Sequence, residues 1–292
     1  MNAVKNVHLF CLLLLPLCLT NPAWTSNPPQ PELIHSRSQV PFKLYAGYVI
    51  VLEGRIGNVG KLKFVLDTGV THSVIDRELA GKIAVAHRPG KVIIFDKTVP
   101  AEWVEVPEVQ FGAIEVAPFS MMVTDLGYFQ SFATKVDAVI GLDLLRLSSF
   151  SIDYDARKVF FGPIDTTGGV PMNSGPICLS VQLLVGDSKL QLVVDTGARA
   201  LVLYEDKILD RLPQVRVEGE LDGVSMGGFV SAKRAILPRA RLGTTDLNAT
   251  VFLVKAPSGN VLSGIDGYLG IAALKAHRID FNFEAKTLGW KR

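Results

Sequence analysis

The sequence predicts an all-β protein that consists of two similar halves. Val, Ile, Leu and Phe are plentiful, Gly and Pro interrupt the chain at short intervals, and no long stretch has the periodicity of an amphipathic helix. Such a pattern is typical of a protein with many short strands. With 292 residues, the chain has room for two domains that each bury a core of their own. An internal repeat indicates where the two halves lie.

An apolar run that ends in Asp-Thr-Gly occurs twice, in residues 61–69 and in residues 189–197. Both runs alternate apolar residues as a β-strand does, and both place the Asp at the turn where the strand stops. A single copy would be a weak signal, because chance places a given tripeptide at on the order of one in a few thousand positions. Two copies in matching contexts are far more specific.

The sequence around the two copies is also repeated. Asp137–Gly141 follows the first copy and Asp266–Gly270 follows the second, and the segments Ser151–Asp155 and Arg278–Asn282 come next. The offsets are 195 − 67 = 128, 270 − 141 = 129 and 280 − 153 = 127. Self-similarity over most of the chain indicates a duplicated structural unit.

The start of the chain has the features of a secretory signal peptide over residues 1–23. A positive charge at Lys5 precedes an apolar segment at residues 9–19, which is too short to span a bilayer comfortably. We therefore expect export of a secreted or periplasmic protein, with an uncleaved membrane tether as the alternative. Residues 24–41 are rich in Pro, Ser and Asn, which predicts a flexible tether.

Cleavage of the leader would leave Cys178 as the last of the three cysteines, so no internal disulfide is expected. The residue lies in the apolar stretch 177–181, where a buried structural thiol is a better interpretation than a nucleophile.

The two predicted halves are residues 42–163 and residues 177–292, joined by a linker at residues 164–176 that contains Thr-Thr-Gly-Gly. In the first half we expect strands at 47–56 and up to 67, a short helix at 76–83 with Asp76 as its N-cap, three strands within 91–123, and a short helix at 142–147. In the second half we expect strands at 177–185 and 189–194, a short helix near 205–212, strands through 215–254, and two closing strands that end at 290.

Asp67 and Asp195 are the candidate catalytic residues. If two similar halves pack about a pseudo-twofold axis, equivalent loops meet at that axis and the two carboxyl groups face each other. Like charges a few ångströms apart do not both ionise easily, so the pair would hold one proton over a broad pH range. The ionised member could then activate a water molecule, while the protonated member donates to a scissile carbonyl. The alternative is that each Asp only caps a turn.

The residues next to the two aspartates suit such a pair. Gly69 and Gly197 let the backbone turn sharply and bring N–H groups towards the carboxylates. Thr68 and Thr196 can form hydrogen bonds across the axis and join the two loops. We therefore expect all four to support the active-site loops.

The paired Asp-Thr-Gly motifs, each followed by an Asp-x-apolar-apolar-Gly segment, resemble those of the aspartic proteases, both the two-lobed pepsin type and the dimeric retroviral type. The resemblance covers roughly residues 45–292. It implies two pseudo-twofold-related lobes of the acid-protease fold, a protein or peptide substrate in the cleft between them, and Asp67 and Asp195 as the catalytic dyad. It also implies an endopeptidase that works as a monomer, without a metal or an organic cofactor. The alternative is a catalytically silent two-lobed protein that binds peptides or cell-envelope ligands.

Two features depart from this family. Val70 and Ala198 follow the glycines and offer no hydroxyl group to the neighbouring carboxylates. Losing a hydrogen bond to the ionised form raises the pKa of a carboxyl group, so we expect a less acidic pH optimum than pepsin-type enzymes have. Residues 80–110 also lack the Tyr of a pepsin-type flap. Lys91–Thr98 is the flap candidate in the first half, and Gly219–Phe229 corresponds to it in the second.

Other functional classes fit the sequence less well. The net charge of +2 provides no basic field of the kind that binds nucleic acid. The Gly-x-Ser-x-Gly pattern at residues 223–227 resembles a serine hydrolase motif, but turn and strand residues follow it where a helix is needed, so we interpret it as a hairpin tip. The histidines lack the close spacing of a metal site.

Overall fold

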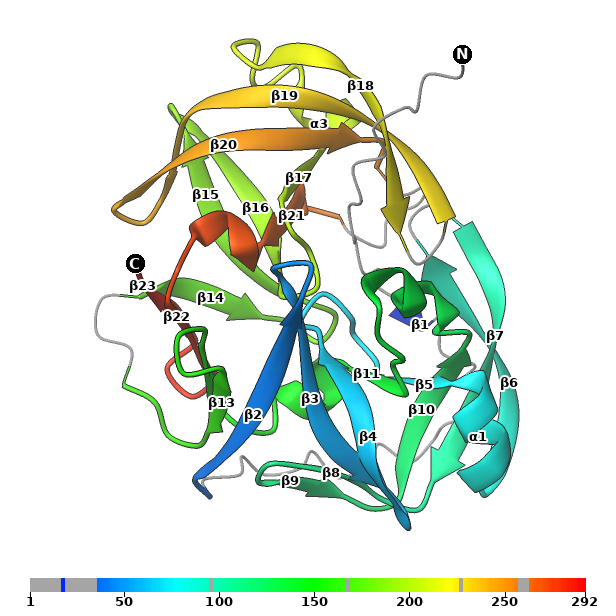
Figure 1. Cartoon of the computed structure of the whole chain (residues 1–292). Coiled ribbons are helices and arrows are strands. Elements are labelled where there is room, and N and C mark those ends of the chain that lie inside the picture. The colour runs from blue at the N-terminus through cyan, green and yellow to red at the C-terminus, as the bar shows by residue number, and fades with distance from the viewer. Residues whose placement is uncertain (1–16, 19–35, 95–96, 166–168, 226–227, 257–262) are drawn as a thin grey trace.

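The computed structural model describes residues 17–18, 36–94, 97–165, 169–225, 228–256 and 263–292 (Figure 1). These residues form a mostly β structure with a few short helices, which confirms the predicted all-β class. No helix in these ranges is both long and apolar enough to cross a membrane.

A first group of strands, which we call the N-terminal sheet, contains the first Asp-Thr-Gly. Its strands are β2 (Ser38–Tyr45), β3 (Val49–Ile56), β4 (Val59–Leu66), β5 (Val74–Asp76), β6 (Ala86–Ile94), β7 (Lys97–Val106), β8 (Val109–Phe111), β9 (Ile114–Val116), β10 (Phe119–Thr124) and β11 (Ala138–Ile140). The helices α1 (Arg77–Ile83), η1 (Gly127–Phe132) and α2 (Leu142–Leu145) are connected to it. The two-residue strand β1 (Leu17–Cys18) pairs with β6.

A second group, the C-terminal sheet, contains the second Asp-Thr-Gly. Its strands are β14 (Val170–Ser174), β15 (Leu179–Val185), β16 (Ser188–Asp195), β17 (Leu201–Tyr204), β18 (Arg216–Ser225), β19 (Gly228–Leu242), β20 (Thr245–Val254) and β21 (Gly267–Gly270). The helices α3 (Glu205–Ile208) and η2 (Ile271–Leu274) belong to this part of the chain.

The same pairing scheme recurs around both motifs. In the N-terminal sheet, β4 pairs parallel with β11, which pairs antiparallel with β5, which in turn pairs parallel with β10. In the C-terminal sheet, β16, β21, β17 and β20 follow each other with the same directions. Each Asp-Thr-Gly therefore leaves its sheet at an equivalent place, next to a buried three- or four-residue strand.

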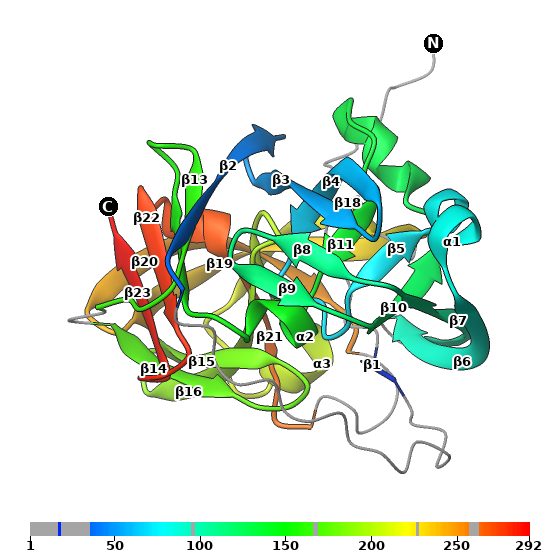
Figure 2. The ribbon, with the colours of Figure 1, turned by 90° about the horizontal axis from the view of Figure 1, so that it is seen from below.

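A third, central sheet joins the other two. It adds β12 (Phe150–Asp153), β13 (Lys158–Phe161), β22 (Arg278–Asn282) and β23 (Thr287–Lys291) to the ends of β2 and β14, in the order β2, β13, β12, β22, β23, β14. Figure 2 shows β2, β13, β22 and β23 gathered at one side of the molecule.

The middle of the central sheet is the β12–β22 pair. Phe150 lies opposite Phe281 with ring centroids 4.6 Å apart, and Ile152 lies opposite Ile279. All four side chains are fully buried and belong to one hydrophobic cluster, which also includes residues of the N-terminal and C-terminal sheets. The two large sheets are therefore anchored to each other through a common core.

The structure corrects several of the predicted element boundaries. β2 begins at Ser38, inside the segment predicted as a tether over residues 24–41, and β14 lies inside the predicted linker at 164–176. Both segments pair because buried side chains, Val40 in β2 and Met172 in β14, alternate with exposed ones. The helix from Arg77 to Ile83 is present as predicted, and Asp76 caps it by accepting a hydrogen bond from the N–H of Glu78. The predicted helices at 142–147 and 205–212 are shorter, Leu142–Leu145 and Glu205–Ile208.

Candidate active site

The two Asp-Thr-Gly loops meet and are joined by hydrogen bonds between their threonines. The N–H of Thr68 donates to Oγ1 of Thr196 over 2.9 Å, and the N–H of Thr196 donates to Oγ1 of Thr68 over 3.1 Å. Each hydroxyl then donates to a backbone carbonyl of the opposite strand end, Thr68 to Val194 over 2.8 Å and Thr196 to Leu66 over 2.9 Å. These four bonds are buried, so the relative position of the two loops is strongly specified.

Asp67 and Asp195 lie at the ends of β4 and β16, as the strand pattern predicts. The N–H of Gly69 donates to Oδ1 of Asp67 over 2.8 Å, and the N–H of Gly197 donates to Oδ1 of Asp195 over 2.7 Å. A methyl group built on Gly69 would lie 2.5 Å from Cγ of Asp195. The carboxyl group of Asp195 therefore packs directly against the loop that carries Asp67.

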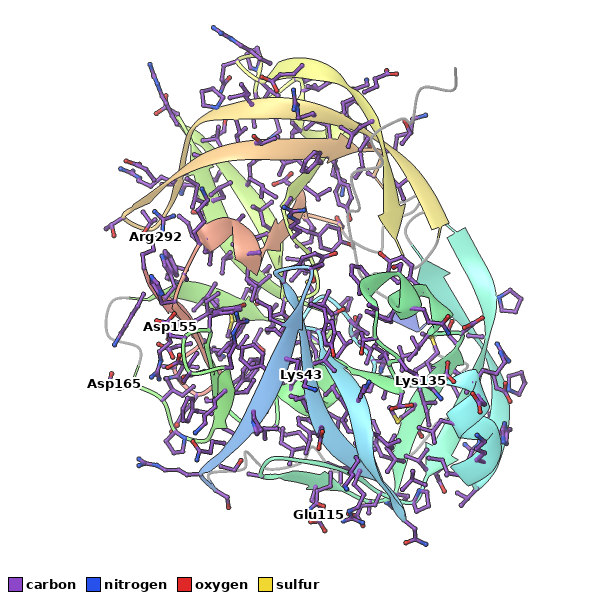
Figure 3. All side chains as sticks on the ribbon, viewed as in Figure 1. Lys43, Glu115, Lys135, Asp155, Asp165 and Arg292 are labelled. Atoms are coloured by element: carbon purple, nitrogen blue, oxygen red, sulfur yellow. The ribbon has the colours of Figure 1, made fainter. Side chains whose placement is uncertain are left out.

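The burial of this pair distinguishes it from other charged residues of the chain. The charged side chains labelled in Figure 3, such as Lys43 and Asp165, are exposed. Four aspartates of the described part of the chain are buried, and two of them are neutralised by arginines: Asp266 pairs with Arg211, and Asp280 pairs with Arg278.

Asp67 and Asp195 are 0% exposed, and no cation of the described residues pairs with either. Oδ2 of each is buried and accepts no hydrogen bond from any other described residue, and the two carboxyl groups lie close enough to form a side-chain hydrogen bond with each other. Val70 and Ala198, which follow the two glycines, have no side-chain donor that could bind these oxygens. Burying an unpaired carboxylate is costly, so the pair must hold a proton, a bound ligand or both.

Burial raises the pKa of both carboxyl groups. For Asp67, desolvation raises the pKa to about 7, although the hydrogen bond from Gly69 lowers it. For Asp195, desolvation and the neighbouring charge of Asp67 raise the pKa well above the ordinary value of an aspartate. The two protons of the pair are therefore lost in separate steps, and between these steps one carboxyl group is ionised while the other holds a proton. Such an arrangement can provide a proton acceptor and a proton donor side by side.

A pair of tyrosines behind Asp195 was not identified from the sequence. The rings of Tyr204 and Tyr268 are buried and lie edge to face, with centroids 5.9 Å apart. Burial raises the pKa of Tyr268 well above its usual range, and the charge of Asp195 adds to this effect. Tyr268 occupies the apolar position of the second Asp-x-apolar-apolar-Gly segment, where the first copy has Val139, and this difference between the copies is the signal that the sequence offers.

Both flap candidates are ends of β-hairpins. Lys91–Thr98 spans the end of the β6–β7 hairpin, and Gly219–Phe229 spans the end of the β18–β19 hairpin. Residues 95–96 and 226–227 of these two candidates lie outside the described residues. Strand β19 follows the Gly-x-Ser-x-Gly pattern directly, so the strand-turn-helix context of a serine hydrolase nucleophile is missing.

Cys178 is half-buried, not buried as the sequence predicts, and it lies just before β15. Desolvation raises the pKa of its thiol to about 11. The thiol is therefore protonated at neutral pH and is a poor nucleophile, in agreement with the structural role that the sequence predicts.

Comparison with known protein families agrees with the paired aspartates that the structure shows. Residues 52–144 match the family model of the aspartyl proteases. The matched segment contains the first Asp-Thr-Gly and ends before the second. No curated protein matches the chain. About a third of the chain, residues 52–144, is thus similar to aspartyl proteases, which supports a protease-type function.

Proposed function

We propose that this protein is an aspartic endopeptidase that hydrolyses peptide bonds with a water molecule activated by Asp67 and Asp195. The observation that supports the proposal is the meeting of two buried carboxyl groups between loops joined by their threonines, where the two carboxyl groups are close enough to share a hydrogen bond. The aspartyl protease match of residues 52–144 supports the same chemistry.

In the proposed mechanism the water molecule binds between the two Oδ2 atoms. Ionised Asp67 takes a proton from the water as it attacks the peptide carbonyl carbon, while protonated Asp195 donates to the carbonyl oxygen. The tetrahedral intermediate then breaks down: the proton held by Asp67 passes to the leaving nitrogen, the C–N bond breaks, and Asp195 takes a proton back from a hydroxyl group that becomes a carbonyl oxygen of the carboxyl product. The chain supplies both carboxyl groups, so a single copy is sufficient.

The substrate in this proposal is an extended protein or peptide segment that lies between the N-terminal and C-terminal sheets. Because both aspartates are 0% exposed, a substrate reaches them only after the residues that cover them move. We also propose that residues 1–23 direct export, so that the enzyme acts outside the cytoplasm, secreted, periplasmic or tethered.

An unbiased peptide mixture tests the proposal. The purified protein is incubated with the mixture, and products are identified by mass spectrometry with and without a pepstatin-like transition-state analogue. We expect new termini at internal peptide bonds and their loss when the analogue is present, because the analogue occupies the position of the attacked carbonyl. A protein that binds the mixture but produces no new termini would instead be the catalytically silent binding protein.

The pH dependence of cleavage follows from the burial of the dyad. Activity requires one ionised carboxyl group, and the raised pKa of Asp67, about 7, moves the first ionisation of the pair upward. We therefore expect the acid limb of the kcat/KM profile to lie above pH 4, with an optimum nearer neutral pH than that of pepsin-type enzymes. A profile with its maximum near pH 2 would contradict this expectation.

A further inference from the structure

The loop that follows the first Asp-Thr-Gly is fastened by a buried serine and an aspartate, which we call the Ser73–Asp143 clamp. Ser73 is 0% exposed. Its hydroxyl donates to Oδ1 of Asp143 over 2.6 Å, and its N–H donates to Oδ2 of Asp143 over 2.7 Å. The hydroxyl also accepts a hydrogen bond from the N–H of Gly141 over 3.0 Å. Three bonds therefore tie this one residue to residues 141–143.

Asp143 extends the clamp along the whole loop. Its N–H donates to the carbonyl of Thr71 over 3.1 Å, and its Oδ2 lies 3.7 Å from Nδ1 of His72. The next residue in the chain, Leu144, donates its N–H to Oδ1 of Asp143 over 2.9 Å. Each carboxylate oxygen thus has at least one donor, which stabilises the carboxylate in its half-buried position.

Gly141, which precedes the clamp residue Asp143, packs tightly against the backbone of the loop that follows Gly69. A methyl group built on Gly141 would lie 2.8 Å from the carbonyl oxygen of Val70 and 2.9 Å from the carbonyl carbon of His72. The N–H of Leu142 also donates to the carbonyl of Val70 over 2.8 Å. A movement of the clamp would therefore be transmitted to the residue that follows Gly69.

Among the described residues, the second Asp-Thr-Gly loop has no equivalent of this clamp. With the offsets of the two copies, 73 + 128 = 201 and 143 + 129 = 272, the corresponding residues are Leu201 and Ala272. Neither side chain can form a hydrogen bond. The loop is held there by the N–H of Gly270, which donates to the carbonyl of Ala200 over 3.1 Å. Within the part of the chain that the structure describes, a serine–aspartate clamp of this kind is thus found only at the loop that carries Asp67.

We propose that Ser73 and Asp143 are positioning residues that hold the loop of Asp67 in place, so that its carboxyl group stays opposite that of Asp195. This inference rests on the proposed protease function. The physical argument is geometric: displacing a catalytic group by about 1 Å can lower a rate about 100-fold, because the reacting atoms lose their alignment.

The test compares Ser73→Ala, Asp143→Ala and the double variant with a matched control, Ser151→Ala. Ser151 is a fully buried serine whose hydroxyl donates to an aspartate, Asp280, in the central sheet. The control removes the same serine-to-aspartate contact outside the clamp, while Arg278 still pairs with Asp280 and the backbone ladder of β12 and β22 is retained. The readouts are kcat and KM on a cleaved peptide, and hydrogen exchange of the amides in residues 67–73, all measured well below each unfolding temperature.

We expect Ser73→Ala to lower kcat about 10-fold or more, with KM changed less than about 2-fold, because a shifted base affects the chemical step more than binding. Exchange in residues 67–73 should become about 10-fold faster. The double variant should have nearly the kcat of Asp143→Ala alone, since both residues act through one contact. Ser151→Ala should keep the wild-type kcat and the wild-type exchange of this segment.

A wild-type kcat or unchanged exchange in Ser73→Ala would overturn the inference, as would an equal fall of kcat in Ser151→Ala. The two kinds of measurement, cleavage kinetics and hydrogen exchange, also test this inference separately from the proposed function. If the wild-type protein cleaves nothing, the protease proposal fails, whereas the exchange of residues 67–73 still decides whether the clamp holds the loop.

Discussion

Replacing Asp67 by Asn is expected to reduce cleavage by about 1,000-fold or more, because the amide cannot take a proton from water. Asp195→Asn should have a comparable effect, since the amide cannot donate as an acid does. The measurement is kcat/KM on a peptide that the wild-type protein cleaves. Asp165→Asn is the matched control, because Asp165 is exposed and far from the dyad in sequence. Cleavage by Asp67→Asn at more than a tenth of the wild-type rate would contradict the proposed roles.

Asp67→Asn should also be more stable than the wild-type protein at neutral and alkaline pH. Burial raises the pKa of Asp67 from 3.8 to about 7, so the folded state holds a proton that the unfolded state has lost above about pH 4. The stability that this group contributes is therefore fully present below pH 3.8 and is lost as the pH rises towards 7. Asn has no charge to desolvate. We expect Asp67→Asn to gain on the order of 4 kcal/mol at pH 8 and little at pH 4, since each unit of pKa shift corresponds to about 1.4 kcal/mol.

Thermal unfolding of both proteins between pH 4 and pH 8 measures this difference. A loss of activity together with a gain in stability would show that Asp67 is retained for chemistry and not for folding. An equal loss of stability in Asp67→Asn at every pH would instead indicate a structural role for the carboxyl group.

Replacing Gly69 by Ala is expected to disrupt the dyad by steric contact with the carboxyl group of Asp195. The new methyl group would lie 2.5 Å from Cγ of Asp195 and 2.7 Å from each of its oxygens. Either the Asp195 carboxyl group or the first Asp-Thr-Gly loop must move, and both movements alter the distance between the two carboxyl groups. We expect kcat to fall at least about 100-fold and stability to fall by about 1–3 kcal/mol.

Gly60→Ala is the matched control for this substitution, because a methyl group on Gly60 meets nothing within 4 Å. It should leave both activity and stability close to those of the wild-type protein. If Gly69→Ala retained the wild-type kcat, the close approach of Asp195 to this loop would be irrelevant to the reaction.

The features that depend on local sequence pattern were predictable. Alternating apolar residues predicted the strands before both aspartates, and the small residues after them predicted the glycine N–H bonds to the carboxylates. Asp76 predicted the start of α1 because an N-cap is a local signal.

Features that depend on distant partners were not predictable in this way. Ser38–Pro41 and Val170–Pro171 look like tether and linker because their composition is polar or interrupted by Pro, and they become strands only because β13 and β23 offer partners. Ser73 and Asp143 are 70 residues apart, so neither suggests the other in a linear sequence. The tyrosine pair behind Asp195 likewise forms only when β17 and β21 come together.

The β12–β22 pair has a consequence for how exactly the two carboxyl groups must be aligned. Within the described residues, it is the only strand ladder between the N-terminal and C-terminal parts of the chain, and it consists of four residue pairs. A slip of that ladder by two residues would keep its apolar face towards the core but shift one part along the other by about 7 Å. That shift exceeds any hydrogen-bond length and would separate the two carboxyl groups. The alignment of the dyad therefore depends on the register in which two phenylalanines and two isoleucines pair on a different sheet.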